Sequence, residues 1–165
     1  MSRAFVKSAD DEPDDNLPER PVSPHPNYVT PKGIAQLQAR VQELQQERDR
    51  LSAEEDDPLA KQKLLEVKRD LRYFKARMES AIPVDPATQP QDEVHLGAVV
   101  EVEGEDRQRR QFNIVGEDEA DVTGGKISWA SPLGKSMIGS KVGDTVVWQR
   151  PVGETELEIV SIRYP

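Results

Sequence analysis

The chain contains no cysteine, so it can form neither disulfides nor thiolate metal sites. Apolar residues make up only 35% of the 165 residues and aromatic residues 5%, which is low for one compact globule. No apolar run approaches the roughly 20 residues that cross a bilayer, and residues 1–9 show no signal-peptide pattern. We therefore expect a cytoplasmic protein without membrane contacts, in which an elongated part accompanies a small globular domain.

The sequence also lacks the motifs of a self-contained enzyme. Its two histidines, His25 and His95, do not belong to a serine or cysteine constellation, and we interpret both as structural or exposed. No HExxH, P-loop or Gly-rich dinucleotide motif is present. These absences favour a protein that acts on or with a partner.

Negative charge dominates, with a formal net charge of −9. Residues 86–165 carry eight basic and fourteen acidic groups, which argues against duplex DNA as the primary partner. Residues 29–85 are neutral on balance, with eleven groups of each sign. Within that stretch, acids cluster in the short run at residues 54–57. Basic residues cluster later in the sequence, at Lys68, Arg69, Arg72, Lys75 and Arg77.

Two helices are predicted between Thr30 and Ile82. Apolar residues recur at alternating steps of three and four, with Arg48 filling one gap, which is the heptad pattern of a coiled coil. The gap between the two runs is short, so we expect an antiparallel hairpin that buries its own seam and suggests a monomer. The predicted seam consists of Ile34, Leu37, Val41, Leu44 and Leu51 on the first arm and of Ala60, Leu64, Val67, Leu71, Phe74, Met78 and Ala81 on the second.

Four acids form the predicted tip of this hairpin: Glu54, Glu55, Asp56 and Asp57. Thr30 and Asp57 are suited to cap the two helices, each followed by a proline at the first helical position. One interpretation is that the acids are simply favoured at a helix N-terminus. The other is that carboxylates at the end of a rod complete a Mg²⁺ site held mostly by another protein.

The rest of the chain divides by composition. Residues 1–28 are acidic and proline-rich and are predicted to be a disordered tail. Residues 29–82 form the hairpin, and prolines mark a linker over residues 83–93. Residues 94–165 predict an α+β domain, a twisted antiparallel sheet packed on one short helix that begins at Ser131 and Pro132 and reaches Gly139. The predicted strands are residues 95–102, 111–115, 126–129, 145–148 and 156–162.

Several motifs, in this order, resemble the Gre family of bacterial transcription factors, over about residues 28 to 164. They are Val29-Thr30-Pro31-Lys32-Gly33, Arg72 to Glu79 with Ile82 to Asp85, Leu96 to Val102, Phe112 to Asp121, Ile127-Ser128, Ser131 to Lys135 and Ile138 to Asp144. Such long and ordered motifs are specific. The resemblance implies an N-terminal coiled coil and an FKBP-like C-terminal domain, which need not be an isomerase.

The resemblance also implies a function and the residues that carry it. Gre factors bind RNA polymerase through its secondary channel, stimulate the polymerase to cleave backtracked RNA and are associated with DNA binding. By resemblance, Ser131 and Pro132 would dock on the channel rim, with Ala130 where GreB-type members carry an acid. The tip acids would share a Mg²⁺ with the polymerase. Arg69, Arg72 and Lys75 would contact the nascent RNA near its 3′ end.

Two departures from the family leave more than one function open. The family's acid-Leu-x-Glu-Asn-Ala tip segment is absent, and the first arm looks about three turns, or about 16 Å, shorter than in full-length members. The short rod favours a non-cleaving factor that occupies the channel, resembling the Rnk regulator of nucleoside diphosphate kinase. A stand-alone coiled-coil adaptor or peptidyl-prolyl isomerase is disfavoured by the Ser131-Pro132 segment.

Overall fold

The computed structural model describes residues 17–54 and 56–165, whose contacts form two compact units. One unit contains the described residues up to Pro24 together with Leu37–Ser80, and the other contains His25–Gln36 together with Ala81–Pro165. Residues 1–16 of the predicted disordered tail lie outside the described part of the chain. The predicted domain boundaries stay predictions. No helix in the described part of the chain has the length and apolar character needed to span a membrane.

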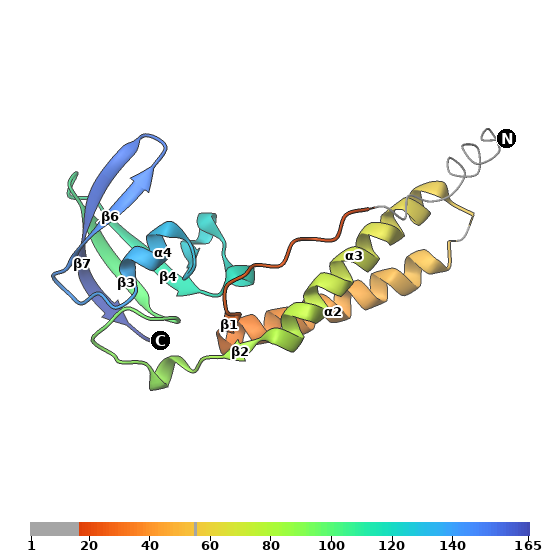
Figure 1. Cartoon of the computed structure of the whole chain (residues 1–165), viewed down its shortest axis with the longest axis horizontal. Helices are drawn as coiled ribbons and strands as arrows, with labels where there is room; N and C mark the ends of the chain where they lie inside the picture. The colour runs from red at the N-terminus through yellow and green to blue at the C-terminus, as the bar shows by residue number, and fades with distance from the viewer. Residues whose placement is uncertain (1–16, 55) are drawn as a thin grey trace. The chain divides into compact units, whose positions relative to one another are not determined.

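The first unit is built on a helical hairpin, formed by α2 (Pro31–Ser52) from Leu37 onward and by α3 (Pro58–Ser80) (Figure 1). The guanidinium of Arg40 lies 5.7 Å from the Phe74 ring, and Lys63 Nζ lies 3.8 Å from Glu47 Oε1. Residue numbers therefore rise on one helix as they fall on the other, so the helices are antiparallel. The seam buries Val41, Leu44, Leu51, Ala60, Val67 and Leu71, with Leu64, Phe74 and Met78 partly buried beside it. Leu37 of the predicted seam is also buried.

Two basic residues of the hairpin are less exposed than is usual for charged side chains. Arg77 is only 2% exposed, so it does not belong to the basic surface of the second arm. Arg48, which interrupts the heptad pattern, is half-buried beside the seam. Long basic side chains can bury their aliphatic stems while the charged group stays near water.

A short parallel pair of strands joins the residues before α2 to those after α3. The pair consists of β1 (Tyr28–Val29) and β2 (Ile82–Pro83). The Ile82 N–H donates to the Asn27 carbonyl at 2.8 Å, and the Val84 N–H donates to the Val29 carbonyl at 2.9 Å. The composition of these segments predicted neither strand, because two-residue strands have no alternation to detect.

The second unit contains a five-stranded sheet in the order β5-β4-β3-β7-β6, which confirms the α+β class. Its strands are β3 (Val99–Gly104), β4 (Arg109–Val115), β5 (Lys126–Ser128), β6 (Thr145–Arg150) and β7 (Gly153–Arg163). All neighbours are antiparallel except β5, which runs parallel to β4 and makes the sheet mixed. Two short 3₁₀ helices, Glu117–Glu119 and Val122–Gly124, carry the chain back so that both strands run the same way.

One short helix, α4 (Pro132–Met137), closes the core of this sheet (Figure 1). The helix ends two residues before the predicted Gly139. That glycine adopts a positive φ of 83°, and its N–H donates to the Val94 carbonyl at 2.8 Å instead of continuing the helix. The core consists of Val94, Ala98, Val100, Val102, Ile114, Leu133, Met137, Val146, Leu157 and Ile159.

Leu44 and Leu59 provide a matched test of the hairpin seam. Leu44 is 1% exposed in the seam, whereas Leu59 is 81% exposed at the start of α3. We expect Leu44→Ala to lower the free energy of unfolding by about 3 kcal/mol, because it removes buried apolar contacts and leaves a cavity. Leu59→Ala should change it by less than about 0.5 kcal/mol. Urea unfolding followed by circular dichroism at 222 nm measures both, and equal costs would contradict the seam.

Candidate functional site

The turn between α2 and α3 is organised by backbone hydrogen bonds. The Glu54 N–H donates to the Leu51 carbonyl at 3.1 Å, and the Asp57 N–H donates to the Glu54 carbonyl at 3.2 Å. The Asp57 carboxylate then accepts from the Leu59 N–H at 3.0 Å, which confirms Asp57 as the cap of α3. One of the four predicted tip acids is therefore used to start a helix.

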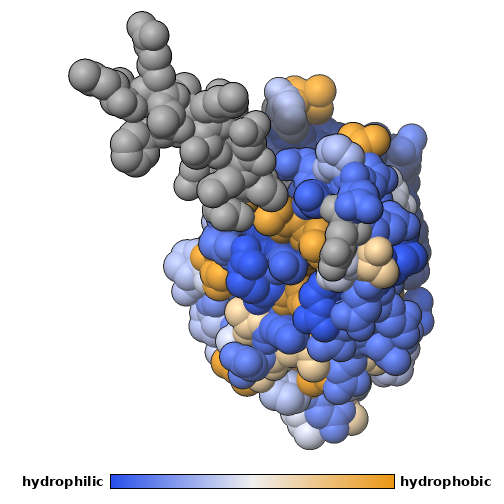
Figure 2. Space-filling view, turned by 90° about the vertical axis from the view of Figure 1, so that its right-hand side faces the viewer, coloured by the Kyte–Doolittle hydropathy of each residue, from blue (hydrophilic) through white to orange (hydrophobic). Residues whose placement is uncertain are grey.

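Two further tip acids, Glu54 and Asp56, lie at this turn with exposed side chains. Asp57 is exposed as well, and Glu55 lies outside the described residues. Within the described part of the chain, the side chains of Glu54 and Asp56 make no hydrogen bond or ion pair. No group of three His, Cys, Asp or Glu side chains among the described residues could hold a metal ion. The face drawn in Figure 2 is mostly hydrophilic, with small separate hydrophobic patches.

A basic pocket of about 230 Å³ lies on the side of the hairpin. Lys68, Arg72 and Lys75 line it from one face of α3, because residues three and four apart lie on the same side of a helix. Arg48 of α2 and Leu71 complete the lining. Two of the three predicted RNA-contacting residues, Arg72 and Lys75, therefore lie together in this pocket. Arg48 also lines it, although the heptad pattern had placed this residue in the seam.

Arg69, the third predicted RNA-contacting residue, does not line the pocket. Its Nε lies 3.2 Å from Asp70 Oδ1, and its side chain is only 26% exposed. By contrast, Lys68 and Lys75 form no ion pair within the described part of the chain. The unpaired positive charge on this face therefore belongs to the pocket and not to Arg69.

An N-terminal strap, residues 17–24, contacts α3 next to the basic pocket. The Arg72 Nε donates to both carboxylate oxygens of Glu19, at 3.0 and 3.1 Å, and Arg72 Nη2 donates to the same carboxylate. This hydrogen bond lowers the pKa of Glu19 below its ordinary value and raises the pKa of Arg72. No local sequence pattern indicated this pair, because its members are 53 residues apart.

The predicted docking segment begins at the N-cap of α4. Ser131 Oγ accepts from the Gly134 N–H at 3.1 Å, which confirms the predicted cap, and donates to the Ser128 carbonyl at 2.6 Å. A Cβ on Gly134 would lie 2.1 Å from the Ser128 carbonyl oxygen, so the helix packs directly on the end of β5. Ser131 thus orients the segment, and its neighbour Pro132 is exposed.

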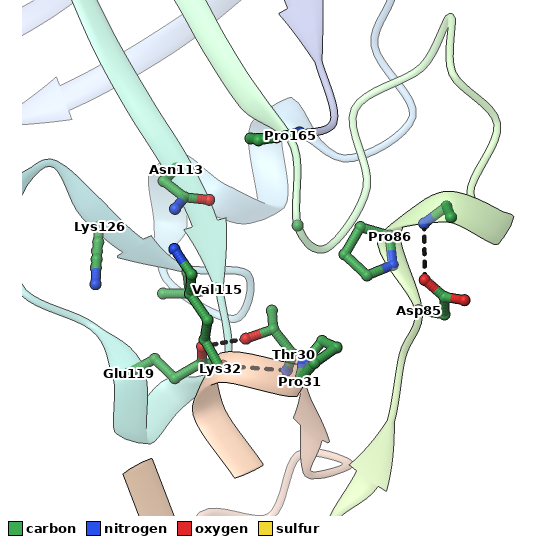
Figure 3. A pocket seen from close by; sticks show the side chains of 12 residues that line it. Thr30, Pro31, Lys32, Asp85, Pro86, Asn113, Val115, Glu119, Lys126 and Pro165 are labelled. Atoms are coloured by element: carbon green, nitrogen blue, oxygen red, sulfur yellow. Dashed lines mark hydrogen bonds between the residues drawn. The ribbon is translucent and has the colours of Figure 1, made fainter. Parts of the chain in front are cut away.

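A buried clamp ties the start of α2 to the loop after β4 (Figure 3). Thr30 Oγ1 donates to Glu119 Oε1, while the backbone N–H groups of Thr30 and Gly116 donate to Glu119 Oε2 at 3.3 and 3.0 Å. The same Thr30 hydroxyl accepts from the Gly33 N–H at 3.1 Å, which confirms the predicted cap of α2. Sequence reasoning found the cap but not Glu119. A pocket of about 350 Å³ beside the clamp is lined in part by Lys32 and Lys126.

Comparisons with known proteins point to one family. The family described as "Transcription elongation factor, GreA/GreB, C-term" matches residues 89–164. The chain is 35% identical to transcription elongation factor GreB of Neisseria meningitidis serogroup B, over 84% of this chain and 94% of that protein. It is 34% identical to GreA of Psychrobacter arcticus, over 82% of this chain and 96% of that protein.

Among solved structures, the chain is similar to the GreA factor homolog Gfh1 of Thermus thermophilus. The two share 26% sequence identity with a TM-score of 0.40, over 84% of this chain and 99% of that one. This chain has fewer residues than the Neisseria GreB over the length in which the two are aligned. The alignment runs over 153 positions, whereas 84% of 165 residues is about 139, which leaves about 14 positions without a residue of this chain.

The clamp gives a stability prediction that separates the hydroxyl of Thr30 from the rest of its side chain. We expect Thr30→Val to lower the free energy of unfolding by about 2 kcal/mol, because it removes the helix cap and leaves the buried Glu119 carboxylate short of a donor. Thr30→Ser keeps the hydroxyl and should retain most of that stability. Urea unfolding measures both variants, and a Ser variant as unstable as the Val variant would show that the hydroxyl contributes little.

Proposed function

This chain belongs to the GreA/GreB family of transcription elongation factors, and from that premise we propose what it does on RNA polymerase. It binds the polymerase through the secondary channel and stimulates cleavage of backtracked transcripts, so that arrested elongation resumes. The chain acts on the polymerase's own catalytic centre and does not cleave RNA alone. The observation that carries the proposal is the exposed carboxylates of Glu54 and Asp56 at the turn of a closed helical hairpin.

The tip carboxylates supply the chemistry of this proposal. Mg²⁺ prefers oxygen ligands and is often held by one or two carboxylates together with water and phosphate oxygens. Glu54 and Asp56 have side chains uncommitted within the described residues, so they are available to add oxygen ligands to a Mg²⁺ that the polymerase holds. Carboxylates in that place would also orient the water that attacks the phosphodiester.

The α4 segment supplies the docking surface. Pro132 is exposed at the first position of the helix, and the Ser131 cap fixes the direction in which it projects. Because both hydrogen bonds of Ser131 stay within this unit, we assign Ser131 a positioning role and Pro132 the contact with the channel rim. This division refines the joint docking role that the family resemblance implies.

A specific observation also favours a second function, a factor that occupies the channel without stimulating cleavage. We place the missing positions, about 14 in number, in the hairpin, because this chain lacks the family's acid-Leu-x-Glu-Asn-Ala tip segment. Shared equally between two antiparallel helices, they correspond to about 10 Å of hairpin length. A carboxylate must lie within about 2.6 Å of a metal ion to bind it. A hairpin that docks like its longer relatives and ends this far short would block the channel without reaching the metal.

A cleavage assay decides between these functions. We expect the wild-type protein to shorten RNA in stalled, backtracked elongation complexes in Mg²⁺, and the variant E54Q/E55Q/D56N/D57N to slow that cleavage on the order of 100-fold. Amides keep the size of the side chains, and asparagine at position 57 can still cap α3. The loss therefore reports the negative charge and not the fold of the turn.

The control is E66Q/E79Q, which removes two exposed acids from α3 away from the tip and leaves all four tip acids in place. It should cleave at nearly the wild-type rate. Cleavage by the quadruple variant at the wild-type rate would refute a catalytic role for the tip acids. If the wild type does not cleave but displaces a known cleavage factor from the polymerase, the channel-occupying function is correct.

Docking is tested separately by binding to core RNA polymerase. We expect Pro132→Ala to weaken binding about tenfold, the loss expected when one of the few energetically dominant contacts of an interface is truncated. Stability should stay nearly unchanged, because alanine is tolerated at the start of a helix. Pro151→Ala, at another exposed proline of the same unit, is the control and should bind normally. Biolayer interferometry measures both affinities, and equal affinities would remove Pro132 from the interface.

A further inference from the structure

The N-terminal strap places a carboxylate on the basic pocket of the hairpin. Its Glu19 binds the Arg72 guanidinium through both carboxylate oxygens. A guanidinium fork fits carboxylates and phosphates with the same paired geometry, so Glu19 occupies on Arg72 the place that a phosphate would take. Arg72 lines the pocket together with Lys68 and Lys75, whose ammonium groups have no ion pair within the described residues.

Arg20 also anchors the strap on α3. Its guanidinium lies 4.1 Å from the centre of the Tyr73 ring and 5.1 Å from that of Phe74, and its Nη1 lies 3.5 Å from Asp70 Oδ1. Cation–π contacts and an ion pair therefore hold Arg20 in place beside Glu19. Neighbouring residues Glu19 and Arg20 thus bind groups of opposite charge on α3, which sets the register of the strap.

The sequence of the strap lowers the cost of this contact. Pro18, Pro21 and Pro24 restrict the backbone on both sides of Glu19 and Arg20. A segment that has fewer conformations to lose binds with less entropic cost. The contact is nevertheless exposed, with side-chain exposures of 56% for Arg72 and 61% for Glu19, so water and competing anions can reach it.

We propose that the strap is an intramolecular competitor of RNA, in which Glu19 masks Arg72 and lowers the affinity of the basic pocket for the phosphates of a single strand. This inference rests on the proposed function together with the RNA contact that the family resemblance implies for Arg72 and Lys75. When RNA binds, a phosphate replaces the Glu19 carboxylate on Arg72, and the strap leaves the pocket. The hairpin then holds RNA firmly only where the strand is delivered to it at high local concentration.

The test measures binding of a fluorescent single-stranded RNA to the full-length protein by anisotropy over a range of salt concentrations. We expect Glu19→Gln to bind about fivefold more tightly at 0.1 M salt. This advantage should shrink as the salt concentration rises, because salt screens the exposed Glu19–Arg72 ion pair that competes with RNA in the wild type. Glu79→Gln removes an equal charge from α3 without touching the Glu19–Arg72 contact, and it should produce a much smaller gain.

A double-mutant cycle isolates the pair. In the Arg72→Gln background, Glu19→Gln should no longer raise the affinity, because the residue that Glu19 masks is gone. A gain that persists in that background, or that Glu79→Gln reproduces, would overturn the competition. Equal affinity of wild type and Glu19→Gln, with weaker binding by Arg72→Gln, would overturn the competition while leaving RNA contact at Arg72 intact. Absence of RNA binding by every variant would overturn both, and leaves the cleavage result unaffected.

Discussion

The buried carboxylate of Glu119 is the group on which the start of α2 depends. It accepts hydrogen bonds from the Thr30 hydroxyl and from two backbone N–H groups, so both oxygens of a polar group that would be costly to bury alone are hydrogen-bonded. The close approach also constrains the backbone around it. A Cβ on Gly33 would lie 2.3 Å from Glu119 Cδ, and one on Gly116 would lie 2.5 Å from the Tyr28 carbonyl oxygen. Any side chain at these two positions would have to push the clamp apart.

The other two helices also begin at a polar side chain that accepts a hydrogen bond from the helix backbone. Asp57 caps α3 at the acidic tip, and Ser131 caps α4 at the proposed docking segment. In each case the capping side chain is held by the helix, while an exposed neighbour, Asp56 or Pro132, is left available to a partner. Helix starts therefore do two things in this protein: they satisfy backbone donors, and they present adjacent residues in a defined direction.

Charge is distributed unevenly along the hairpin, so its tip and its side differ in the groups that they can bind. The tip is negative and suited to a metal ion, whereas the side of α3 is positive and suited to phosphate. The strap adds a carboxylate to the positive side, so the chain contains both an anion-binding surface and its own competitor. Membership of the GreA/GreB family gives these surfaces a common partner, and the length of the hairpin decides how far the acids extend.

The sequence alone determined the features that depend on neighbouring residues. Heptad spacing located both helices, Thr30, Asp57 and Ser131 marked their starts, and alternation located most strands, because helices and turns are stabilised by contacts within a few residues. Tertiary structure alone decided the parallel pairing of β5, the burial of Arg77 and the contacts of Glu19 and Glu119. Glu19 and Arg72 are 53 residues apart, and Thr30 and Glu119 are 89 residues apart. Such pairs meet only when the chain folds, and no local pattern of charge or hydrophobicity specifies which acid will meet which donor.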